Sequence, residues 1–324
     1  MDNWAKIIKK YPEANFLQSP EYAKMNELLG CKVFSEDFEG KAYALMIVRN
    51  AKRGRYMEVP CGPLVDWKDS KMVKAVLKKI TEVAKQEKCV FVRMRPQLKA
   101  EASNLKMLEK LGLKKSPMHL AAEHTVMIDL TKSEDELLAN MRRQTRYEVR
   151  RADKVGIKVS KSNDEKIFEE FQKCQAETAK RQNFVPPNLK TLLAEKEAFK
   201  DNIEIYKATL DDEPVAYGLI IGSGKEADYY EAASTLLNRK MPGAYALLWQ
   251  AMKDLKKAGY ERFNLWGIAP AGQPNHRYAG VTTFKTGFGG KVLEFVPAHD
   301  LVISKMRYAA DFAFETMRKK RRRL

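Results

Sequence analysis

One segment of this 324-residue chain combines a lysine with closely spaced glycines and aromatic rings. It reads TFKTGFGG from Thr283 to Gly290, and the lysine is Lys285. Glycines allow a ligand to approach the backbone closely, and a neighbouring lysine could stabilise a developing oxyanion or bind phosphate. The spacing is not that of a P-loop, because the lysine precedes the glycines. A β-bulge beside an exposed lysine would give the same letters, so both interpretations stay open at this point.

A second segment concentrates positive charge on one side of a predicted helix. Arg142, Arg146 and Arg150 are spaced by four residues and therefore share a helix face. Guanidinium groups bind phosphate oxygens, so this face suits a nucleic acid backbone or a pyrophosphate. A solvated helix face, with Glu148 and Asp153 as partial partners, would give the same pattern.

The chain ends in six successive basic residues, 318–323, after an amphipathic stretch that includes Met306, Phe312 and Met317. Such a tail attracts RNA or anionic lipid head groups, although a solubilising end would look alike. The whole chain is basic as well, since 59 Lys and Arg against 42 Asp and Glu give a formal charge of +17.

Several common kinds of site are absent from the sequence. There is no H-E-x-x-H pair, no C-x-x-C pair and no G-x-S-x-G elbow, so we expect neither a metal site nor a serine hydrolase triad. The histidines and cysteines are scattered along the chain, at His119, His124, His276, His299, Cys31, Cys61, Cys89 and Cys174.

An acyl-CoA acyltransferase would need a glycine-rich pyrophosphate loop, [QR]-x-x-G-x-[GA], at the start of a long helix. The matching place reads NRKMPGA from Asn238 to Ala244. Pro242 stands where the first glycine would be, and it lacks the backbone N–H group that would donate a hydrogen bond to a phosphate. This argues against CoA as the donor.

Apolar runs alternate with amphipathic helices along the chain, which predicts an α/β or α+β fold. Strands are expected at 41–48, 56–59, 89–94 and 125–130, and later at 156–159, 203–209, 214–221, 227–232 and 262–266. Three or four strands, a helix and another strand occur twice, in the order found in GNAT-like acyltransferases.

We place the domain boundary after the strand that ends at Leu130, where Ser133 and Glu136 form a capping box for a long helix reaching Gly156. The prediction is a first GNAT-like domain at 1–132 and a second at 133–298. A C-terminal helix at 299–324 is expected to pack back on the first domain.

No apolar stretch approaches the roughly 20 residues that a membrane-spanning helix needs. The N-terminus lacks the basic start and continuous apolar core of a signal peptide. Scattered cysteines favour a reducing compartment, so we expect a cytoplasmic protein.

Stretches in order along nearly the whole chain resemble the Fem family of peptidoglycan-branching aminoacyltransferases. Segment 142–156, RRQTRYEVRRADKVG, is similar to the family's R-x-x-T-R-x-x-I-R-K-A-x-K-x-G. The most specific pair is LWGI at 265–268 and GVTTFKTGFGG at 280–290. The others are FLQSPEY at 16–22, ETAKRQNF at 177–184, PVA at 214–216, AAS at 232–234, MP at 241–242 and LWQ at 248–250.

The resemblance implies two tandem GNAT-like domains that share a cleft, without the coiled-coil arm of longer members. It implies transfer of an amino acid from aminoacyl-tRNA to the stem-peptide amine of a peptidoglycan precursor, either UDP-MurNAc-pentapeptide or lipid II, which forms interpeptide bridges. Aminoacyl-tRNA would be a co-substrate and no cofactor is expected. A tRNA donor would account for the basic charge, and the basic tail suggests peripheral contact with the inner membrane surface.

By the same resemblance, Lys285 would stabilise the tetrahedral intermediate or bind the terminal phosphate and ribose of the tRNA. The expected substrate-binding residues of the cleft are Lys24, Arg181, Tyr229, Glu231 and Trp266. The expected tRNA-binding residues are Arg142, Arg146 and Arg150.

Departures from the family concern the acceptor. After Arg181 the chain continues as FVPP at 184–187 with no later arginine, and Glu231 stands where a tyrosine is common. Arg95 stands where an acidic residue is frequent. Two alternatives therefore stay open: a GNAT-type N-acyltransferase using acyl-CoA, and a non-catalytic protein that binds RNA or a membrane surface.

Overall fold

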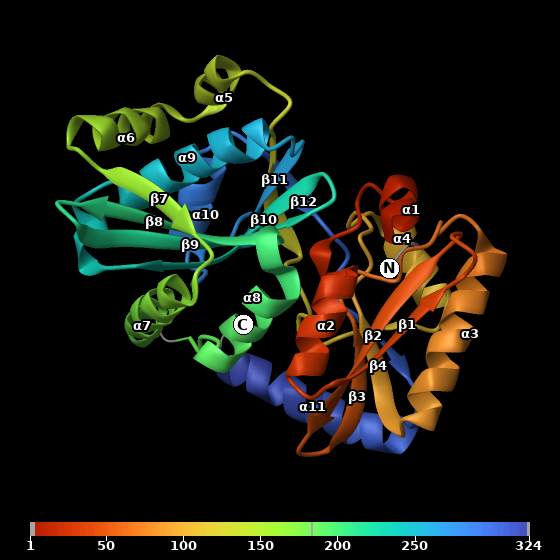
Figure 1. The fold of residues 1–324 in the computed structure, drawn as a ribbon. Helices are drawn as coiled ribbons and strands as arrows, with labels where there is room; N and C mark the ends of the chain where they lie inside the picture. The colour runs from red at the N-terminus through yellow and green to blue at the C-terminus, as the bar shows by residue number, and fades with distance from the viewer. Residues whose placement is uncertain (1–3, 183, 323–324) are drawn as a thin grey trace. The chain divides into compact units, whose positions relative to one another are not determined.

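The chain folds into two compact units, each built around one mixed sheet (Figure 1). The computed structural model describes residues 4–182 and 184–322, without the side chains of 320–322. The first unit comprises Met1–Glu123 and Glu294–Leu324, and the second comprises His124–Leu293. The α/β fold class predicted from the sequence is confirmed.

The first unit has a six-stranded sheet in the order β1-β2-β3-β4-β13-β5. Its strands are β1 (Lys32–Asp37), β2 (Tyr43–Ala51), β3 (Gly54–Val59), β4 (Cys89–Met94), β5 (Lys114–Lys115) and β13 (His299–Val302). β3 and β4 are parallel, because the chain crosses between them through α3 (Ser70–Gln86). The Asp69 side chain caps that helix, and Val76 and Ile80 on its apolar face are buried in the core.

The remaining helices of this unit are α1 (Trp4–Lys10), α2 (Pro20–Leu28), α4 (Ala102–Lys110), α11 (Lys305–Arg322) and the short η1 (Phe16–Gln18). A buried ion network ties α11 to the sheet. Arg93 on β4 donates to both carboxylate oxygens of Asp300 on β13 at 2.8 Å and to Glu315 on α11 at 2.7 Å. The C-terminal segment is therefore part of the first unit.

The second unit has a seven-stranded sheet in the order β12-β6-β11-β10-β9-β8-β7. Its strands are β6 (His124–Asp129), β7 (Lys158–Ser162), β8 (Ile203–Leu210), β9 (Glu213–Ser223), β10 (Glu226–Ser234), β11 (Arg262–Gly267) and β12 (Lys291–Glu294). The strands expected at 203–209 and 214–221 form a hairpin, β8 and β9, and Asp211 and Asp212 at its turn have φ of 48° and 64°. Aspartate tolerates that left-handed conformation, which two-residue hairpin turns need.

Helices cover both faces of this second sheet. α6 (Arg143–Lys154) and α9 (Gly243–Lys257) pack with Tyr206, Ala216 and Tyr229 in one apolar core. α7 (Glu165–Gln182) and α8 (Leu189–Phe199) lie on the opposite face, where the ring of Phe171 contacts that of Tyr217. The other helical segments are α5 (Glu134–Asn140), α10 (Ala279–Thr286), η2 (Lys200–Asn202) and η3 (Leu236–Arg239).

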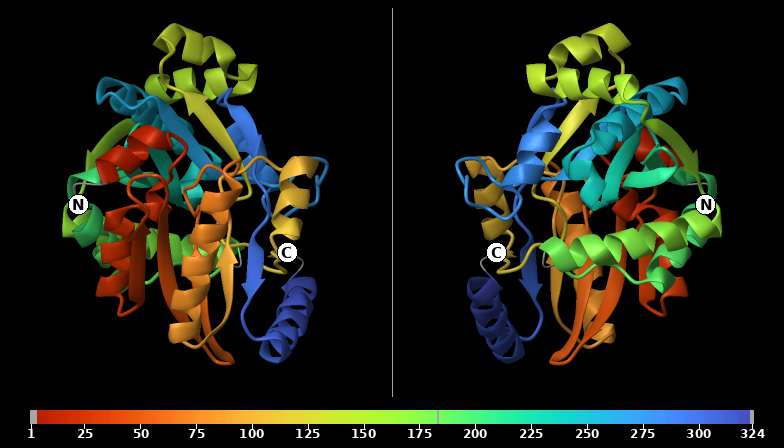
Figure 2. Two further views of the ribbon diagram at one scale, coloured as in Figure 1. Left: turned by 90° about the vertical axis from the view of Figure 1, so that its right-hand side faces the viewer. Right: turned by 90° about the vertical axis from the view of Figure 1, so that its left-hand side faces the viewer.

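The single long helix expected from Ser133 to Gly156 is wrong, because the structure has α5 and α6 instead. The predicted Ser133–Glu136 capping box starts α5, but Met141 between the two helices is extended, with ψ of 148°. Met141 is buried in the core, and the next residue, Arg142, donates its N–H to the carbonyl of Gly287 at 2.8 Å. In Figures 1 and 2, α5 and α6 lie on the side of α9 that faces away from the sheet.

Two other expectations differ from the structure. The strand that was to close the first domain, β6, belongs to the second unit because Asp129, Ile128 and Met127 pair with β11. The division therefore falls at residue 124 rather than after 132. The expected helix at 299–324 begins as β13, and helix α11 starts at Lys305.

Within the described residues, the longest helices are too polar to pass through a bilayer, and none meets the requirement for a transmembrane span. Residue 323 and the side chains of 320–322, which belong to the predicted cationic tail, lie outside the described residues.

Candidate functional site

The candidate site lies where two adjacent parallel strands of the second unit stop pairing. β10 and β11 pair only where Glu226–Asp228 lie opposite Arg262–Asn264. Beyond that point β10 has a bulge between Tyr229 and Glu231, and β11 has an irregularity between Asn264 and Gly267. Bulges redirect side chains and end ladder pairing, and they are frequent beside active sites.

Lys285 projects from the last turn of α10 to this place. Its Nζ donates to the carbonyl of Gly267 at 3.0 Å and lies 5.8 Å from the ring centroid of Tyr229. Only 8% of the residue is exposed, and burial lowers the pKa of the amine to about 7. The exposed lysine on a β-bulge, which the sequence left open, is thus not what the structure shows.

Trp266 has an unusual backbone conformation at the end of β11. Its φ is 63°, in the left-handed region that is uncommon for a bulky residue. Two buried polar side chains hold it there: the Trp266 N–H donates to Asn264 Oδ1 at 2.9 Å, and Thr125 Oγ1 donates to the Trp266 carbonyl at 3.1 Å. The indole packs edge-on against Tyr230 at 5.3 Å. Such strain is concentrated at functional sites in proteins.

Tyr229 and Glu231, which we expected to line one cleft, face opposite sides of the sheet. Tyr229 pairs with Ile220 and Glu231 with the next residue, Leu219, because the bulge leaves Tyr230 out of register. Tyr229 is therefore buried with α9 beside Lys285, and burial raises the pKa of its hydroxyl. Glu231 instead faces α7, where Gln175 Nε2 donates to it at 2.6 Å.

The surroundings of Glu231 could not be predicted from the sequence. Gln175 on α7 and Glu195 on α8 are both buried. Burial raises the pKa of Glu195 and of Glu231. The charge of Glu231 raises the pKa of Glu195 further. No motif signals this cluster, since its three members come from three separate elements.

Arg181, in the last turn of α7, contacts the end of strand β10. Its guanidinium donates to the carbonyl of Ser234, the last residue of β10, and to Thr178 Oγ1 at 3.0 Å. Lys24, by contrast, is an exposed residue of α2 in the first unit. Its predicted role beside Lys285 stays a prediction.

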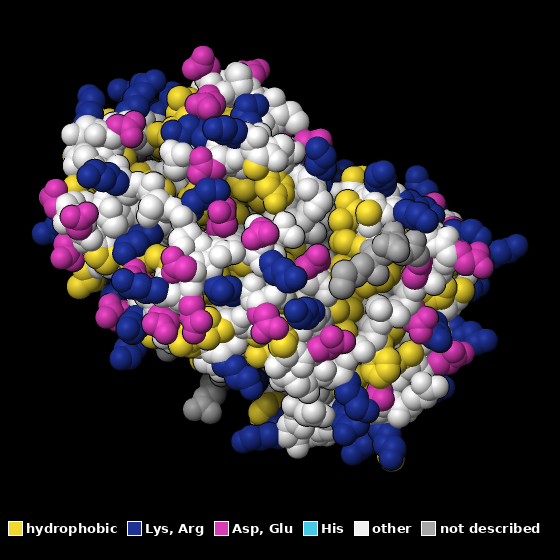
Figure 3. All heavy atoms as spheres, in the orientation of Figure 1, with side chains coloured by type: hydrophobic (Ala, Val, Ile, Leu, Met, Phe, Trp, Pro, Cys, Tyr) yellow, Lys and Arg dark blue, Asp and Glu magenta, His cyan; other side chains and the backbone are white. Residues whose placement is uncertain are grey.

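The three arginines predicted to form a ladder are used differently. Arg142 donates to the Thr283 carbonyl and to Thr286 Oγ1 on α10 at 3.4 Å. Arg146 donates to the carbonyls of Ala139 and Met141 at 2.8 and 2.6 Å, at the end of α5. Arg150 is exposed on α6, where Lys and Arg side chains gather on the surface (Figure 3). Arg142 and Arg146 thus make hydrogen bonds within the protein, while Arg142 and Arg150 are both exposed, and phosphate binding by these arginines stays a prediction.

The first two backbone N–H groups of α9 already donate within the protein. Pro242 is its N-cap, the Gly243 N–H donates to the Met241 carbonyl, and the Ala244 N–H donates to Asn238 Oδ1 at 3.0 Å. A Cβ on Gly243 would lie 2.4 Å from Val215 Cγ1, so this glycine serves helix packing. These contacts support the sequence argument against a CoA loop.

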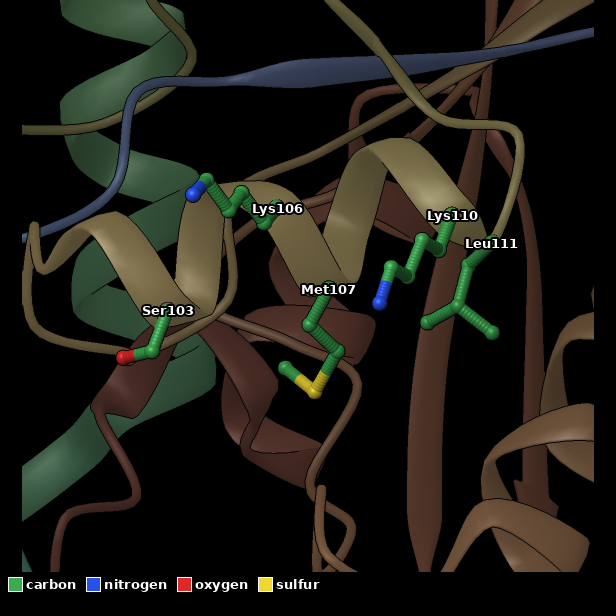
Figure 4. A pocket seen from close by; sticks show the side chains of 5 residues that line it. All are labelled: Ser103, Lys106, Met107, Lys110 and Leu111. Carbon is green, nitrogen blue, oxygen red and sulfur yellow. The ribbon is translucent and has the colours of Figure 1, made fainter.

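Neither a metal-ligand cluster nor the hollow on α4 offers a second reactive site in the described residues. Across the described ranges, no group of three or more His, Cys, Asp or Glu side chains could hold a metal ion. A hollow of about 400 Å³ lies on α4 of the first unit (Figure 4). Lined by Ser103, Lys106, Met107, Lys110 and Leu111, it brings no acid and base together.

Comparison with known proteins identifies relatives over most of the chain. The model of the FemAB family matches residues 2–213 and 188–316. A lipid II:glycine glycyltransferase of Staphylococcus epidermidis is 26% identical over 228 residues, which cover 64% of this chain and 54% of that protein. The chain thus spans about half the length of this relative. The aminoacyltransferase FemA of the same species is 21% identical over 332 residues, covering 76% of this chain and 80% of FemA.

Solved structures show the same fold. The crystal structure of FemX superposes with a TM-score of 0.84 and 17% identity, over 96% of this chain and 98% of FemX. A tandem GNAT protein from the clavulanic acid pathway has a TM-score of 0.54 and 10% identity, over 81% of this chain and 79% of that one. The fold predicted from the resemblance, tandem GNAT-like domains, is confirmed, and the match to the family model over most of the chain shows that this protein belongs to the FemAB family.

Proposed function

We propose that this protein is a tRNA-dependent aminoacyltransferase that moves an amino acid to the stem-peptide amine of a peptidoglycan precursor. The observation that carries the proposal is Lys285, a buried amine held against the end of β11 where β10 and β11 part. Relatives named as a glycyltransferase and an aminoacyltransferase support the reaction class.

The reaction would be aminolysis of the ester that joins the amino acid to the tRNA ribose. The neutral acceptor amine attacks the carbonyl carbon, a C–N bond forms, and the carbonyl oxygen becomes an oxyanion. Protonated Lys285 would stabilise that oxyanion, because a positive donor in a buried site acts strongly on developing charge. The C–O bond to the ribose then breaks, and the ribose oxygen receives a proton as the amine loses one. An amine with a pKa near 7 can exchange protons at neutral pH.

The donor proposed is aminoacyl-tRNA, which needs no further cofactor. Arg150 and the other exposed basic side chains of α6 would contact its phosphates, while Arg142 and Arg146 would mainly hold α6 in place. The internally bonded start of α9 favours this donor over acyl-CoA. Trp266, Tyr229, Arg181 and Lys24 stay proposed contacts of the two substrates.

The acceptor would be a UDP-linked or a lipid-linked precursor in the cytoplasm. We favour the lipid-linked form because α11 carries a stripe suited to a membrane surface. Met306, Ala310, Ala313 and Met317 recur at helical spacing and are all exposed, Met306 by 89% and Met317 by 63%. Arg307 and Arg318 flank them, which fits peripheral contact with anionic lipid.

The test is transfer of radiolabelled amino acids from a charged total-tRNA pool to UDP-linked and lipid-linked stem peptides. We expect a ribonuclease-sensitive product with wild type and with Lys291→Ala, an exposed lysine nearby in sequence. Lys285→Ala should reduce the rate at least about tenfold, or about 1.4 kcal/mol of transition-state stabilisation. No product with any pairing would refute the proposal and redirect attention to CoA donors or plain RNA binding.

A further inference from the structure

One buried and one partly exposed carboxyl group lie on the α7/α8 face of the second unit. Glu195 projects from α8 and is 3% exposed, and Glu231 projects from β10 and is partly exposed. Gln175 of α7, also 3% exposed, donates its Nε2 to Glu231 Oε2 at 2.6 Å, and Glu231 is close enough to Glu195 for its charge to raise the pKa of Glu195. Three separate elements thus converge on one cluster.

The cluster is rich in acceptors that lack donors. Within the described part of the chain, Glu195 Oε2 and Gln175 Oε1 are buried and have no hydrogen-bond partner. Each such buried acceptor costs about 1–3 kcal/mol. A proton on Glu195 would supply a single O–H donor, whereas a group with several N–H or O–H donors could serve Gln175, Glu195 and Glu231 together.

The charge of the cluster points to a cation. No ion pair joins Glu195 or Glu231 to a lysine or arginine in the described residues, and nearby Arg181 is directed to the Ser234 carbonyl and Thr178. Burial and mutual repulsion raise the pKa of Glu195, and burial raises that of Glu231. A positive ligand would allow both carboxyls to ionise.

We propose that Glu195, Glu231 and Gln175 form a binding site for a primary ammonium group of a substrate. This inference rests on the proposed function, in which both the aminoacyl ester and the acceptor peptide carry such a group. An ammonium has three donors, enough for Glu231 and the two unpartnered oxygens. Partly exposed Glu231 gives access, and it follows Tyr229, the neighbour of Lys285, by only one bulged residue along β10.

The site would recognise one substrate amine on the α7/α8 side, next to the place where β10 and β11 stop pairing and Lys285 approaches from α10. A carboxylate beside an ammonium could also accept the proton that the acceptor amine must lose before it attacks. That second role applies only if the bound amine is the acceptor's. The identity of the amine therefore decides whether the cluster sets donor specificity or prepares the nucleophile.

Direct binding of small amines tests this without tRNA or transfer. The probes are alaninamide, which mimics the donor, Nα-acetyl-lysinamide, which mimics the acceptor, and N-acetyl-alaninamide as the uncharged control. NMR titration of the full chain should show binding of at least one amine, weakened about tenfold or more by Glu231→Gln and by Glu195→Gln. Glu177→Gln, which removes an exposed carboxylate from α7, should bind like wild type.

Proton release gives a second readout that packing alone would not change. Calorimetry near pH 7 in two buffers of different ionisation enthalpy should show protons leaving the protein as the amine binds. Binding of either amine would support the site and would identify the substrate that supplies the amine. Equal binding by the glutamine variants, or binding of the uncharged control as tight as that of the amines, would overturn the proposal. Because Glu231 is partly exposed, Glu231→Gln keeps the test valid if Glu195→Gln does not fold. Failed transfer with intact amine binding would instead count against the proposed function alone.

Discussion

Lys285 is the residue whose chemistry differs most from its usual form. A lysine in water has a pKa of about 10.4, but burial of this one lowers the pKa to about 7. The Gly267 carbonyl at 3.0 Å accepts a hydrogen bond from either the neutral or the charged amine, so it positions the group without fixing its charge. A buried amine balanced between two protonation states suits a reaction in which charge appears and disappears.

This balance predicts how stability depends on pH. In the unfolded chain Lys285 keeps its proton up to about pH 10, whereas in the folded protein it loses it near pH 7. The unfolded state therefore binds more protons between about pH 7 and 10, and the free energy of unfolding should rise with pH there. The slope from this one group is at most about 1.4 kcal/mol per pH unit.

Urea denaturation of wild type and Lys285→Met at several pH values would measure it. The difference in unfolding free energy, variant minus wild type, should be largest at pH 7 and shrink as pH rises to 10. Lys291→Met, at an exposed position, should run parallel to wild type. A pH-independent difference for Lys285→Met would show that the amine titrates normally.

At the scale of elements, α5 and α6 show how arginines that look alike in sequence take different roles. Arg146 donates hydrogen bonds to carbonyls at the C-terminal end of α5, where a basic group also interacts favourably with the helix dipole. Arg142 connects the start of α6 to α10, the helix that carries Lys285. Arg150 extends from the exposed side of the same helix.

We therefore expect Arg146→Ala and Arg150→Ala to separate stability from RNA binding. Arg146→Ala should lower the free energy of unfolding by about 1–2 kcal/mol, because it leaves carbonyls of α5 unpaired. Arg150→Ala should leave stability within about 0.5 kcal/mol and weaken tRNA binding. The slope of log affinity against log salt should fall by about 0.7–0.9 for one lost phosphate contact.

Filter binding at several salt concentrations and thermal melts would provide both numbers. Lys166→Ala on α7 is a control that removes one exposed positive charge elsewhere in the second unit. An Arg150→Ala protein with the wild-type salt slope would contradict a role of this α6 face in tRNA binding.

Local patterns predicted the elements that local contacts stabilise. The Ser133–Glu136 capping box formed as expected, because its hydrogen bonds close within a few residues. The break at Met141 could not be predicted, since it depends on Gly287, far along the chain.

The candidate site follows the same rule. Lys285 could be named from its motif, but its burial depends on strands that separate only in the folded sheet. A single bulge at Tyr230 decides that Tyr229 and Glu231 face opposite sides, and a period-two pattern cannot show it. Glu195 and Gln175 meet Glu231 through tertiary packing alone.

At the scale of the whole molecule, the formal charge of +17 makes any polyanion a partner by attraction, whether RNA or an anionic membrane. Charge by itself cannot distinguish the two. The exposed apolar stripe of α11 can, because RNA offers little for methionine side chains to enter, whereas a bilayer surface does. Two attractions with different salt dependence are thus present in one chain.

Vesicle binding should therefore respond to the stripe as well as to charge. Flotation with vesicles containing anionic phosphatidylglycerol is expected to retain wild type at low salt, at about 1 kcal/mol per basic residue near the surface. Met306→Ser with Met317→Ser leaves the net charge unchanged but removes the apolar contribution, so binding should fall about tenfold or more at physiological salt. Val185→Ser with Leu236→Ser, two equally exposed apolar positions of the second unit, should bind like wild type. The contrary outcome is an α11 variant that floats as wild type does, with both proteins released by 0.5 M salt, which is well above physiological ionic strength. Attraction by charge alone would then explain membrane binding, and α11 would have no specific role there.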